Sequence, residues 1–386
     1  MLDFTYQRRT RLHFGKNALS KLSEELPHFD KTVLLVTGGS SVRKNGLYDR
    51  VKADLAKAGK EVFEVTGVHP NPRVDKVREG IEICKRQKVG LVLGVGGGST
   101  IDTAKGIAAG ALYDGDVWDL YQYKKPCKVA LPIGCILTLA ATGTEMNGNS
   151  VVTNFETGEK LGLVTPLALQ PTFSILDPSA TLTVPPDHTA NGCVDILVHV
   201  FEQYFSQTPE TPLQDRMGEA VMVTLIENAR RVHKNPSDYD ARANIMWCGT
   251  IALNNQLGLG KVEDWASHGI EHELSAIYDI AHGAGLAILT PQWMKHVLDA
   301  GVGKFEQYAR RVWGVTNPDA RAAALEGIEK TKAFYRELGV PVTLTEAGIG
   351  ADRIAEMAKK AVRLGPLGGF KKLDAAAVEA ILRASL

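Results

Sequence analysis

Aspartate and histidine residues recur at helical spacing in the second half of the chain. Asp195 and His199 stand four residues apart, as do His268 and His272, and His282 follows shortly afterwards. Because residues i and i+4 lie on the same face of a helix, each pair can approach one point. The chain has 10 histidines, and the grouping of three of them here is not explained by composition. One aspartate with two or three histidines and no thiolate suits a divalent cation such as Fe(II), Zn(II), Co(II) or Mn(II).

A cation held by these residues could keep one coordination position open for a substrate oxygen. Its charge would favour the alkoxide that accompanies hydride transfer to or from the adjacent carbon. The alternative is that the histidines are core or surface residues that bind no metal. A site for a hydride carrier elsewhere in the chain would favour the first interpretation.

The run Gly96-Gly97-Gly98-Ser99 follows a buried apolar segment and precedes a helical one. Backbone without side chains lets a phosphate approach the amide groups at a helix N-terminus, so Gly97, Gly98 and Ser99 are candidates for binding a pyrophosphate. The run departs from the G-x-G-x-x-G dinucleotide motif, and glycines at such turns also serve packing. Asp102 could complement the helix dipole or reach a cofactor hydroxyl, and both interpretations stay open.

A second glycine turn, Gly38-Gly39-Ser40-Ser41, ends the first strong strand candidate. Nucleotide-binding folds commonly place the residue that reads the adenosine ribose at this point, and NAD-binding sites usually have an acid there. Here two glycines and two serines are followed by Arg43 and Lys44, which suits a 2′-phosphate better than a free hydroxyl. The turn predicts a preference for NADP(H) over NAD(H), the alternative being an ordinary flexible turn.

Apolar β-branched runs alternate with helical segments in the first half of the chain, and amphipathic helical segments follow. We expect an α/β N-terminal dinucleotide-binding domain with a Rossmann-like parallel sheet over residues 1–184 and an all-α C-terminal domain over residues 185–386. The boundary follows from the Pro185-Pro186 pair, which cannot lie inside a helix. Expected strands cover residues 32–37, 61–65, 90–95, 129–133 and 172–176, expected helices cover 46–58 and 74–87 and begin at 100, and a hairpin turn is expected at 154–158.

Composition restricts the class of partner. The 386 residues include 44 Lys+Arg and 44 Asp+Glu, so the chain has no net basic field for nucleic acid or an anionic membrane. No apolar run follows the first arginines and none is long enough to span a bilayer, so we expect a cytoplasmic protein with a small-molecule substrate. The 5 cysteines are scattered without a C-x-x-C pair, which argues against a disulfide framework or a thiolate zinc site.

In combination, these motifs resemble the iron-containing (group III) alcohol dehydrogenase family, specifically its butanol dehydrogenase and broad aldehyde reductase branch. The resemblance covers essentially the whole chain. It rests on five elements in family order: Gly94 to Ser99 with Asp102, Thr142-Gly143-Thr144-Glu145, Asp195-x-x-x-His199, His268-Gly269 with His272, and His282-Gly283.

The resemblance implies one divalent metal, Fe(II) or Zn(II), held by Asp195, His199, His268 and His282. His272 matches a histidine beside the metal that is not a ligand, and it either relays the hydroxyl proton or only shapes the pocket. The implied reaction is the interconversion of small alcohols and aldehydes with NADP(H). The implied assembly is a homodimer.

The resemblance also implies which residues contact the cofactor. Gly97, Gly98, Ser99 and Asp102 would lie at the pyrophosphate and nicotinamide side, and Asn71 would approach the adenosine end. Gly39 stands where NAD-specific relatives carry an aspartate, and Lys160 matches a position that can meet the extra phosphate. Thr138, Thr142 and Asn147 would line the cofactor groove, while Gly38 and Ser40 belong to the turn expected at the adenosine ribose.

Alternatives of the same architecture are a polyol or glycerol dehydrogenase and a dehydroquinate-synthase-like lyase. A third is a protein that binds metal and nucleotide without catalysis. A synthase needs a basic pocket for a phosphorylated substrate, and no Lys/Arg cluster accompanies the proposed ligands in the sequence.

Overall fold

The computed structural model describes residues 1–386 and divides into two compact units. One unit is Gln7–Pro185, and the other combines Pro186–Leu386 with Met1–Tyr6. The predicted boundary assigns the first six residues to the α/β domain, whereas the structure groups them with the helical unit. Their backbone explains this: Met1 N donates to Pro209 O and Leu2 N donates to Gly260 O, each at 2.9 Å.

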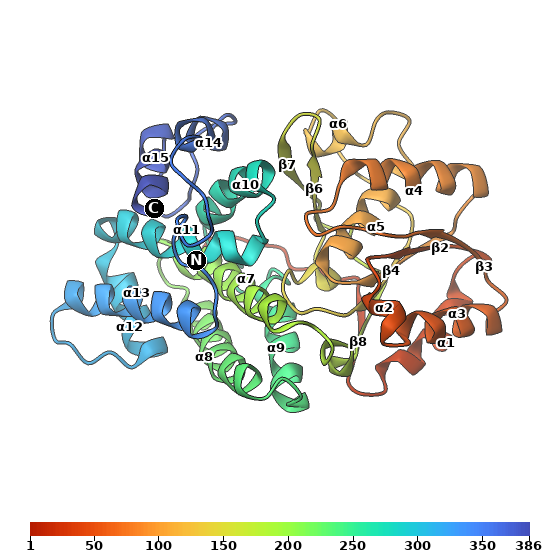
Figure 1. Ribbon diagram of the computed structural model, residues 1–386, viewed down its shortest axis with the longest axis horizontal. Coiled ribbons are helices and arrows are strands. Elements are labelled where there is room, and N and C mark those ends of the chain that lie inside the picture. Colours follow the sequence, from red (N-terminus) through yellow and green to blue (C-terminus); the bar gives the residue numbers. More distant parts are fainter. The chain divides into compact units, whose positions relative to one another are not determined.

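The Gln7–Pro185 unit is built on a six-stranded parallel sheet (Figure 1). Alternate residues of its strands pack on opposite faces: Val33 and Leu93 belong to a core with Leu22, Val51 and Leu55 of α1 and α3, while α4 and α5 cover the other face (Figure 1). In sheet order the strands are β1 (Arg11–Phe14), β8 (Phe173–Leu176), β5 (Ile133–Leu137), β4 (Leu91–Gly96), β2 (Thr32–Thr37) and β3 (Glu61–Val65).

Helices and a separate hairpin complete this unit. The helices are η1 (Ala18–Lys21), α1 (Leu22–Glu25), η2 (Leu26–His28), α2 (Ser41–Lys44), α3 (Leu47–Lys57), α4 (Val74–Gln87), α5 (Gly98–Ala111), α6 (Trp118–Tyr121), η3 (Thr144–Met146) and η4 (Pro178–Thr181). The hairpin joins β6 (Asn149–Asn154) to antiparallel β7 (Glu159–Val164). The predicted α/β class, parallel sheet and hairpin are confirmed.

One predicted strand is wrong in position, and one strand was not predicted. Residues 129–133 were expected to form a strand, but β5 spans Ile133–Leu137. Pro132 has no N–H to donate to the ladder, so regular pairing in this central strand begins after it. The edge strand β1 has only 4 residues of mixed burial, too short for a periodic signal.

The strand order has a switch point at the carboxyl ends of β2 and β4. From β2 the chain continues outward to β3, then returns to β4 on the other side of β2 and moves away through β5. Ligands of open parallel sheets bind where the connections diverge in this way, at the carboxyl ends of the strands. Both glycine turns identified in the sequence, after Thr37 and after Gly96, lie at these ends.

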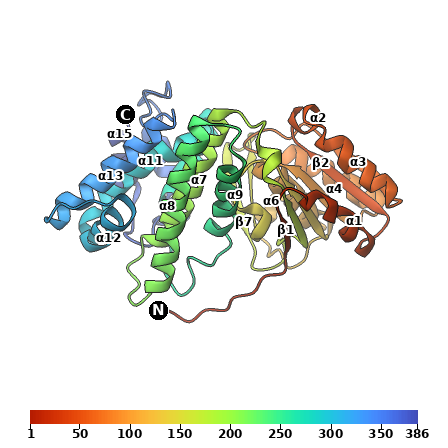
Figure 2. The same cartoon turned by 90° about the horizontal axis from the view of Figure 1, so that it is seen from below.

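The second unit is helical, as expected. Pro186 begins its first helix. The N–H of a first helical residue has no acceptor within the helix, so proline, which lacks that N–H, is tolerated there. The long helices α7 and α8 run side by side (Figure 2). The helices are α7 (Pro186–Tyr204), α8 (Pro212–Lys234), α9 (Tyr239–Ala252), α10 (Ala266–Tyr278), α11 (His282–Val297), η5 (Leu298–Ala300), α12 (Val302–Trp313), α13 (Ala320–Glu337), α14 (Ile354–Ala361) and α15 (Ala375–Ala384).

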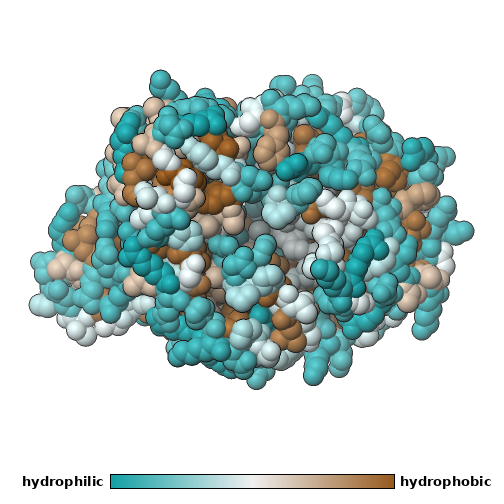
Figure 3. Space-filling view, viewed as in Figure 1, coloured by the Kyte–Doolittle hydropathy of each residue, from teal (hydrophilic) through white to brown (hydrophobic).

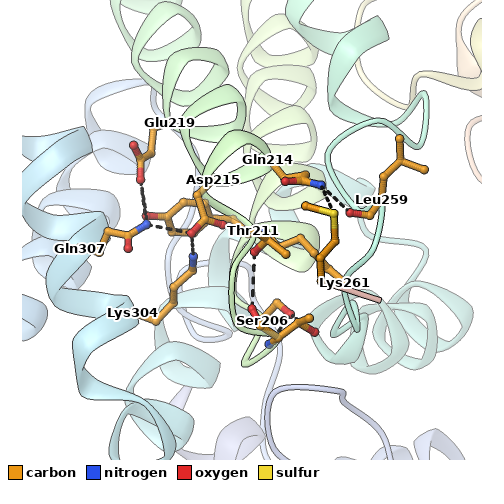
Figure 4. Close-up of polar contacts among 12 residues, drawn as sticks. Ser206, Thr211, Gln214, Asp215, Glu219, Leu259, Lys261, Lys304 and Gln307 are labelled. Carbon is orange, nitrogen blue, oxygen red and sulfur yellow. Dashed lines mark hydrogen bonds and ion pairs between the residues drawn. The ribbon is translucent and has the colours of Figure 1, made fainter. Parts of the chain in front are cut away.

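A buried ion network lies between α8, α12 and the segment before α10 (Figure 4). Asp215 accepts a hydrogen bond from Lys261 Nζ at 2.8 Å and another from Lys304 Nζ. Gln307 Nε2 donates to Asp215 Oδ2 at 3.2 Å and to Glu219 Oε1 at 2.9 Å. Since the cations and carboxylates compensate one another, this network serves packing within the helical unit.

No helix of the protein combines the length and apolar character needed to cross a bilayer. On the face drawn in Figure 3, hydrophilic residues predominate and apolar residues are scattered among them.

Candidate metal centre and dinucleotide site

Three helices of the second unit carry the aspartate and histidines singled out in the sequence. Asp195 and His199 lie on α7, His268 lies on α10, and His282 is the first residue of α11. The glycines that follow His282 explain how α11 packs so closely against α7 and α10. A Cβ on Gly283 would lie 2.1 Å from the Asn191 carbonyl oxygen of α7, and one on Gly285 would lie 2.9 Å from Glu271 of α10.

Nitrogen atoms of the three histidines converge on Asp195 Oδ1. His199 Nδ1 lies 3.5 Å from it, His282 Nε2 lies 3.6 Å from it, and His268 Nε2 lies 3.7 Å from it. Donor atoms of Asp195, His268 and His282 all lie within 4.8 Å of one another. His199 adjoins this group, with its ring stacked on His268 at 4.7 Å between centroids.

Three of these buried donor atoms have no hydrogen-bond partner: Asp195 Oδ1, His199 Nδ1 and His268 Nε2. Leaving such groups unsatisfied in the interior is costly, and it is unusual for three to face one another. Two donors bound about 2.1 Å from one cation at a tetrahedral angle lie about 3.4 Å apart. The observed separations of 3.5 to 3.7 Å fit that spacing, so the residues fit a divalent metal.

Two buried glutamates hold the other sides of the imidazole rings. His268 donates through Nδ1 and through its backbone N to Glu202 Oε1, each at 3.0 Å. His282 Nδ1 donates to Glu271 Oε2, and Ser275 Oγ donates to Glu271 Oε1. A carboxylate on Nδ1 directs the Nε2 lone pair toward the cluster and makes the imidazole a better ligand.

Burial and charge perturb the ionisation of the cluster. Burial opposes ionisation of Asp195, but the facing histidines, His199 foremost, hold its pKa well below the usual range. Burial lowers the pKa of His199 to about 3, so its ring is neutral and able to donate a lone pair. Burial also opposes protonation of His268, yet Asp195 and Glu202 raise its pKa to about 9. In the absence of a cation, the charge of Asp195 is therefore compensated by a proton on His268, and a bound metal would displace that proton.

His272 lies one turn after His268 on α10, half-buried, with its ring centroid 6.1 Å from that of His282. Trp265 precedes the same helix in the left-handed region, with a φ of 63° that a bulky residue rarely adopts. Its ring meets His268 edge to face at 5.3 Å, and Glu263 accepts its indole N–H at 2.5 Å. The histidine group therefore has an aromatic neighbour that the sequence did not reveal.

The glycine turn between β4 and α5 lies against a second loop of the same unit. A Cβ on Gly98 would lie 2.6 Å from the Thr142 side chain, and one on Gly97 would lie 3.3 Å from Leu139 Cβ. Thr138 N donates to Gly96 O at 2.9 Å. Backbone amides at the start of α5 are thus flanked closely by residues 138–142, an arrangement that can hold a pyrophosphate.

The other predicted residues of this region lie on the same loop or against it. Asn147 Nδ2 donates to Gly143 O at 2.9 Å. Asp102 accepts from Thr144 Oγ1 at 2.6 Å and from Val151 N at 2.9 Å, so both of its carboxylate oxygens bind the loop and the strand after it. Besides the two functions left open for Asp102, these contacts show a third: its carboxylate attaches the loop to α5.

The turn at residues 38–41 lies beside the first one, since a Cβ on Gly38 would lie 3.1 Å from Thr100 Oγ1. Gly39 and Ser40 are exposed. Lys160, by contrast, lies on β7, buried, and its Nζ donates to Asn71 Oδ1 at 3.1 Å. Asn71 is also buried and has a φ of 50°, in the left-handed region that asparagine adopts more readily than most residues with a side chain.

Sequence reasoning missed Glu202, Glu271 and Lys105. A signal existed for the glutamates, because Glu202 follows His199 by three residues and Glu271 follows His268 by three, which places each near a ligand face of its helix. No local pattern distinguishes them from the many solvated glutamates of amphipathic helices.

Comparison with known families identifies both halves of the chain. A model described as iron-containing alcohol dehydrogenase matches residues 9–178. A second, described as the C-terminal part of the Fe-containing alcohol dehydrogenase family, matches residues 189–386.

Individual relatives match over nearly the whole length. The chain is 49% identical to "Probable NADH-dependent butanol dehydrogenase 1" of Bacillus subtilis, covering 100% of both chains. It is 40% identical to "NADPH-dependent aldehyde reductase YqhD" of Escherichia coli, covering 93% of both. The crystal structure of NADH-dependent butanol dehydrogenase A from Thermotoga maritima superimposes with a TM-score of 0.97 at 42% identity, covering 100% of this chain and 99% of that one.

Proposed function

The chain belongs to the iron-containing alcohol dehydrogenase family, and from this premise we propose that it interconverts small primary alcohols and aldehydes of about butanol size. Hydride would pass between the substrate and a nicotinamide dinucleotide. The relatives at 49% and 40% identity are named for butanol and for aldehydes, which supports this substrate class.

We propose that Asp195, His199, His268 and His282 hold one divalent metal, Fe(II) or Zn(II). The observation that carries this is the convergence of their donor atoms on Asp195 Oδ1, with three buried atoms lacking any hydrogen-bond partner. Glu202 and Glu271 would hold the rings of His268 and His282 in the tautomer that exposes Nε2.

When bound, the metal supplies polarisation of the substrate oxygen, and the dinucleotide supplies or accepts hydride. The chain's own residues position these groups and handle the proton. In the reductive direction one proton must reach the former carbonyl oxygen, and we propose that an imidazole nitrogen of His272 holds it. The half-buried position of this ring next to His282 supports that role. The same nitrogen would take the hydroxyl proton when an alcohol is oxidised.

We further propose that the dinucleotide site prefers NADPH over NADH. The exposed turn at Gly39 and Ser40 presents no carboxylate, and Arg43 follows it. The nearest acid on the adjoining strand is Glu64, but its carboxylate is bound by Lys52 at 2.8 Å and by the Tyr48 hydroxyl. Relatives at 46 to 49% identity are named NADH-dependent, so the preference requires a direct measurement.

The remaining predicted residues are proposed as dinucleotide contacts on the same unit. Asn71 and Lys160 are joined by a hydrogen bond and would act together, and the others surround the two glycine turns. They are Gly38, Gly39, Ser40, Gly97, Gly98, Ser99, Asp102, Thr138, Thr142 and Asn147.

We also propose a homodimer as the assembly. Strand β1 lies at the end of the sheet, where one backbone edge can pair with another chain. Light scattering on the purified protein would give twice the chain mass of 41.8 kDa for a dimer.

The test is oxidation of NADPH with butanal, run on metal-stripped protein and again after anaerobic addition of Fe(II) or Zn(II), with NADH in parallel. Turnover restored by metal and faster with NADPH is expected. Tight dinucleotide binding without turnover for any metal or aldehyde would refute the enzymatic proposal and favour a non-catalytic binding protein.

A further inference from the structure

Lys105 is a fully buried lysine in the middle of α5. Its Nζ donates to Thr144 O at 2.6 Å, Asn147 O at 2.8 Å and Asn149 O at 2.9 Å, and it lies 3.2 Å from Asn147 Oδ1. One ammonium group thus meets four oxygen atoms of a single loop. Burial lowers the pKa of Lys105 to about 8 while Asp102 raises it, so at pH 7 the group is mostly protonated and can donate three hydrogen bonds.

Asp102 lies one turn earlier on α5 and binds the same loop by accepting hydrogen bonds, whereas Lys105 donates them. Its carboxylate accepts from Thr144 Oγ1 and from Val151 N, and its backbone oxygen accepts from Ser150 Oγ at 2.8 Å. Tyr121 supports this end, with its hydroxyl 2.6 Å from Ser150 Oγ. The Asp102 and Lys105 pair therefore fastens residues 144–151 to one face of α5.

The loop depends on these contacts because it has little regular structure. It begins at Gly143, whose φ of 57° is left-handed, and contains one short turn of 3-10 helix, Thr144–Met146. A Cβ on Gly148 would lie 2.0 Å from Thr165 O, so the chain is confined on that side. Lys105 donates to three backbone carbonyls of this segment: Thr144 O at the start of the 3-10 turn, Asn147 O between that turn and β6, and Asn149 O at the start of β6.

The fastened loop adjoins the glycine turn of the dinucleotide site. Thr142 immediately precedes it and lies against Gly98, while Asn147 donates to Gly143 O within it. Gly98 also begins α5, the helix that carries Lys105. One rigid helix therefore fixes both the phosphate-binding turn and the loop facing it.

We propose that Lys105 is a positioning residue for the dinucleotide: by holding residues 144–149 to α5 it keeps Thr142 and Asn147 in the place from which they contact the cofactor. This inference rests on the proposed dinucleotide site and goes beyond it, since it assigns cofactor affinity to a side chain that does not touch the cofactor. Removing the donors frees the loop, and the energy of ordering it must then come from cofactor binding.

The experiment is a fluorescence titration of the metal-free full chain with NADPH and NADH, comparing wild type with Lys105→Met. Methionine keeps length and apolar volume but donates no hydrogen bond. The expected result is a rise in the dinucleotide dissociation constant of about 10- to 100-fold, as for several buried acceptors left without donors, with Zn(II) affinity unchanged. Hydrogen exchange of residues 142–151 should accelerate in the same variant.

The matched control is Lys261→Met in the helical unit. Lys261 is likewise buried and bound to a single carboxylate, that of Asp215 (Figure 4). The Lys261→Met substitution should lower thermal stability without changing dinucleotide affinity. Equal affinities for wild type and Lys105→Met, or equal weakening in both lysine variants, would overturn the inference.

Should Lys105→Met fail to fold, Thr144→Val removes only the hydroxyl bond to Asp102 and should weaken binding about 3- to 10-fold. Unchanged binding there would also overturn the inference. A wild-type chain that binds neither dinucleotide would instead refute the proposed function.

Discussion

Replacing Gly39 with aspartate should shift the cofactor preference from NADPH, the proposed cofactor, towards NADH. Gly39 is exposed, its backbone is not left-handed, and an added Cβ would meet nothing within 4 Å. The new side chain can therefore be accommodated without strain. It would stand at the end of β2, where nucleotide-binding folds place the acid that binds a free ribose hydroxyl.

The size of the effect follows from Coulomb's law. A 2′-phosphate carries nearly two negative charges, and at roughly 6 Å with an effective dielectric constant of about 40 to 80 their repulsion by one carboxylate is about 1.4 to 3 kcal/mol. That corresponds to a loss of about 10- to 100-fold for NADPH. NADH gains one hydrogen bond from its ribose hydroxyl, about 1 kcal/mol or fivefold, so the preference should shift by about 50- to 500-fold.

The assay is kcat/KM for NADPH and NADH with butanal, measured for wild type, Gly39→Asp and Gly39→Asn. Asparagine has the same shape without the charge, so it should change the NADPH value less than about threefold. High salt should reduce the Gly39→Asp effect. An unchanged preference in Gly39→Asp, or the same shift with asparagine, would refute the reasoning that the turn reads the 2′-phosphate electrostatically.

Three further results are expected. His268→Ala should abolish metal binding and activity together while dinucleotide affinity is retained, and alanine at the exposed His233 should do neither; turnover by metal-free His268→Ala would contradict the proposed mechanism. Glu271→Gln should weaken Zn(II) binding about 10- to 100-fold in a chelator competition, unlike Glu219→Gln in the ion network around Asp215. Burial raises the pKa of four thiols to about 12. Burial raises the pKa of Cys127 as well, but its thiol is only half-buried whereas the other four are buried, so an aromatic disulfide reagent should titrate Cys127 alone in the native protein and all 5 cysteines in denaturant.

Much of the fold was accessible from local sequence, because strand and helix periodicities report which residues are buried. The strands at Thr32–Thr37 and Glu61–Val65 and the helix at Val74–Gln87 have the predicted bounds. The prediction failed where length or a single residue decides the outcome. The short edge strand Arg11–Phe14 has too few residues for a periodic signal, and Pro132 delays β5 because it cannot donate to the ladder.

The candidate metal residues were found because their chemistry is visible in residue type and spacing. Their supporting carboxylates were not, although Glu202 and Glu271 are more deeply buried than His268 and His282, the histidines they hold. A glutamate on a helix is usually solvated, and only packing against another helix shows that it is not.

Sequence alone determined most strands of the sheet, the separation into α/β and helical parts, and the candidate residues for binding a metal or a phosphate, since these depend on local periodicity and side-chain chemistry. The tertiary structure decided how they combine. Asp195 meets His268 and His282 only because α7, α10 and α11 pack together, with glycines permitting the approach. Lys105 finds its acceptors about 40 residues further along the chain, at Thr144 and Asn147. Such contacts follow from the packing of whole elements, for which no short stretch of sequence carries the information.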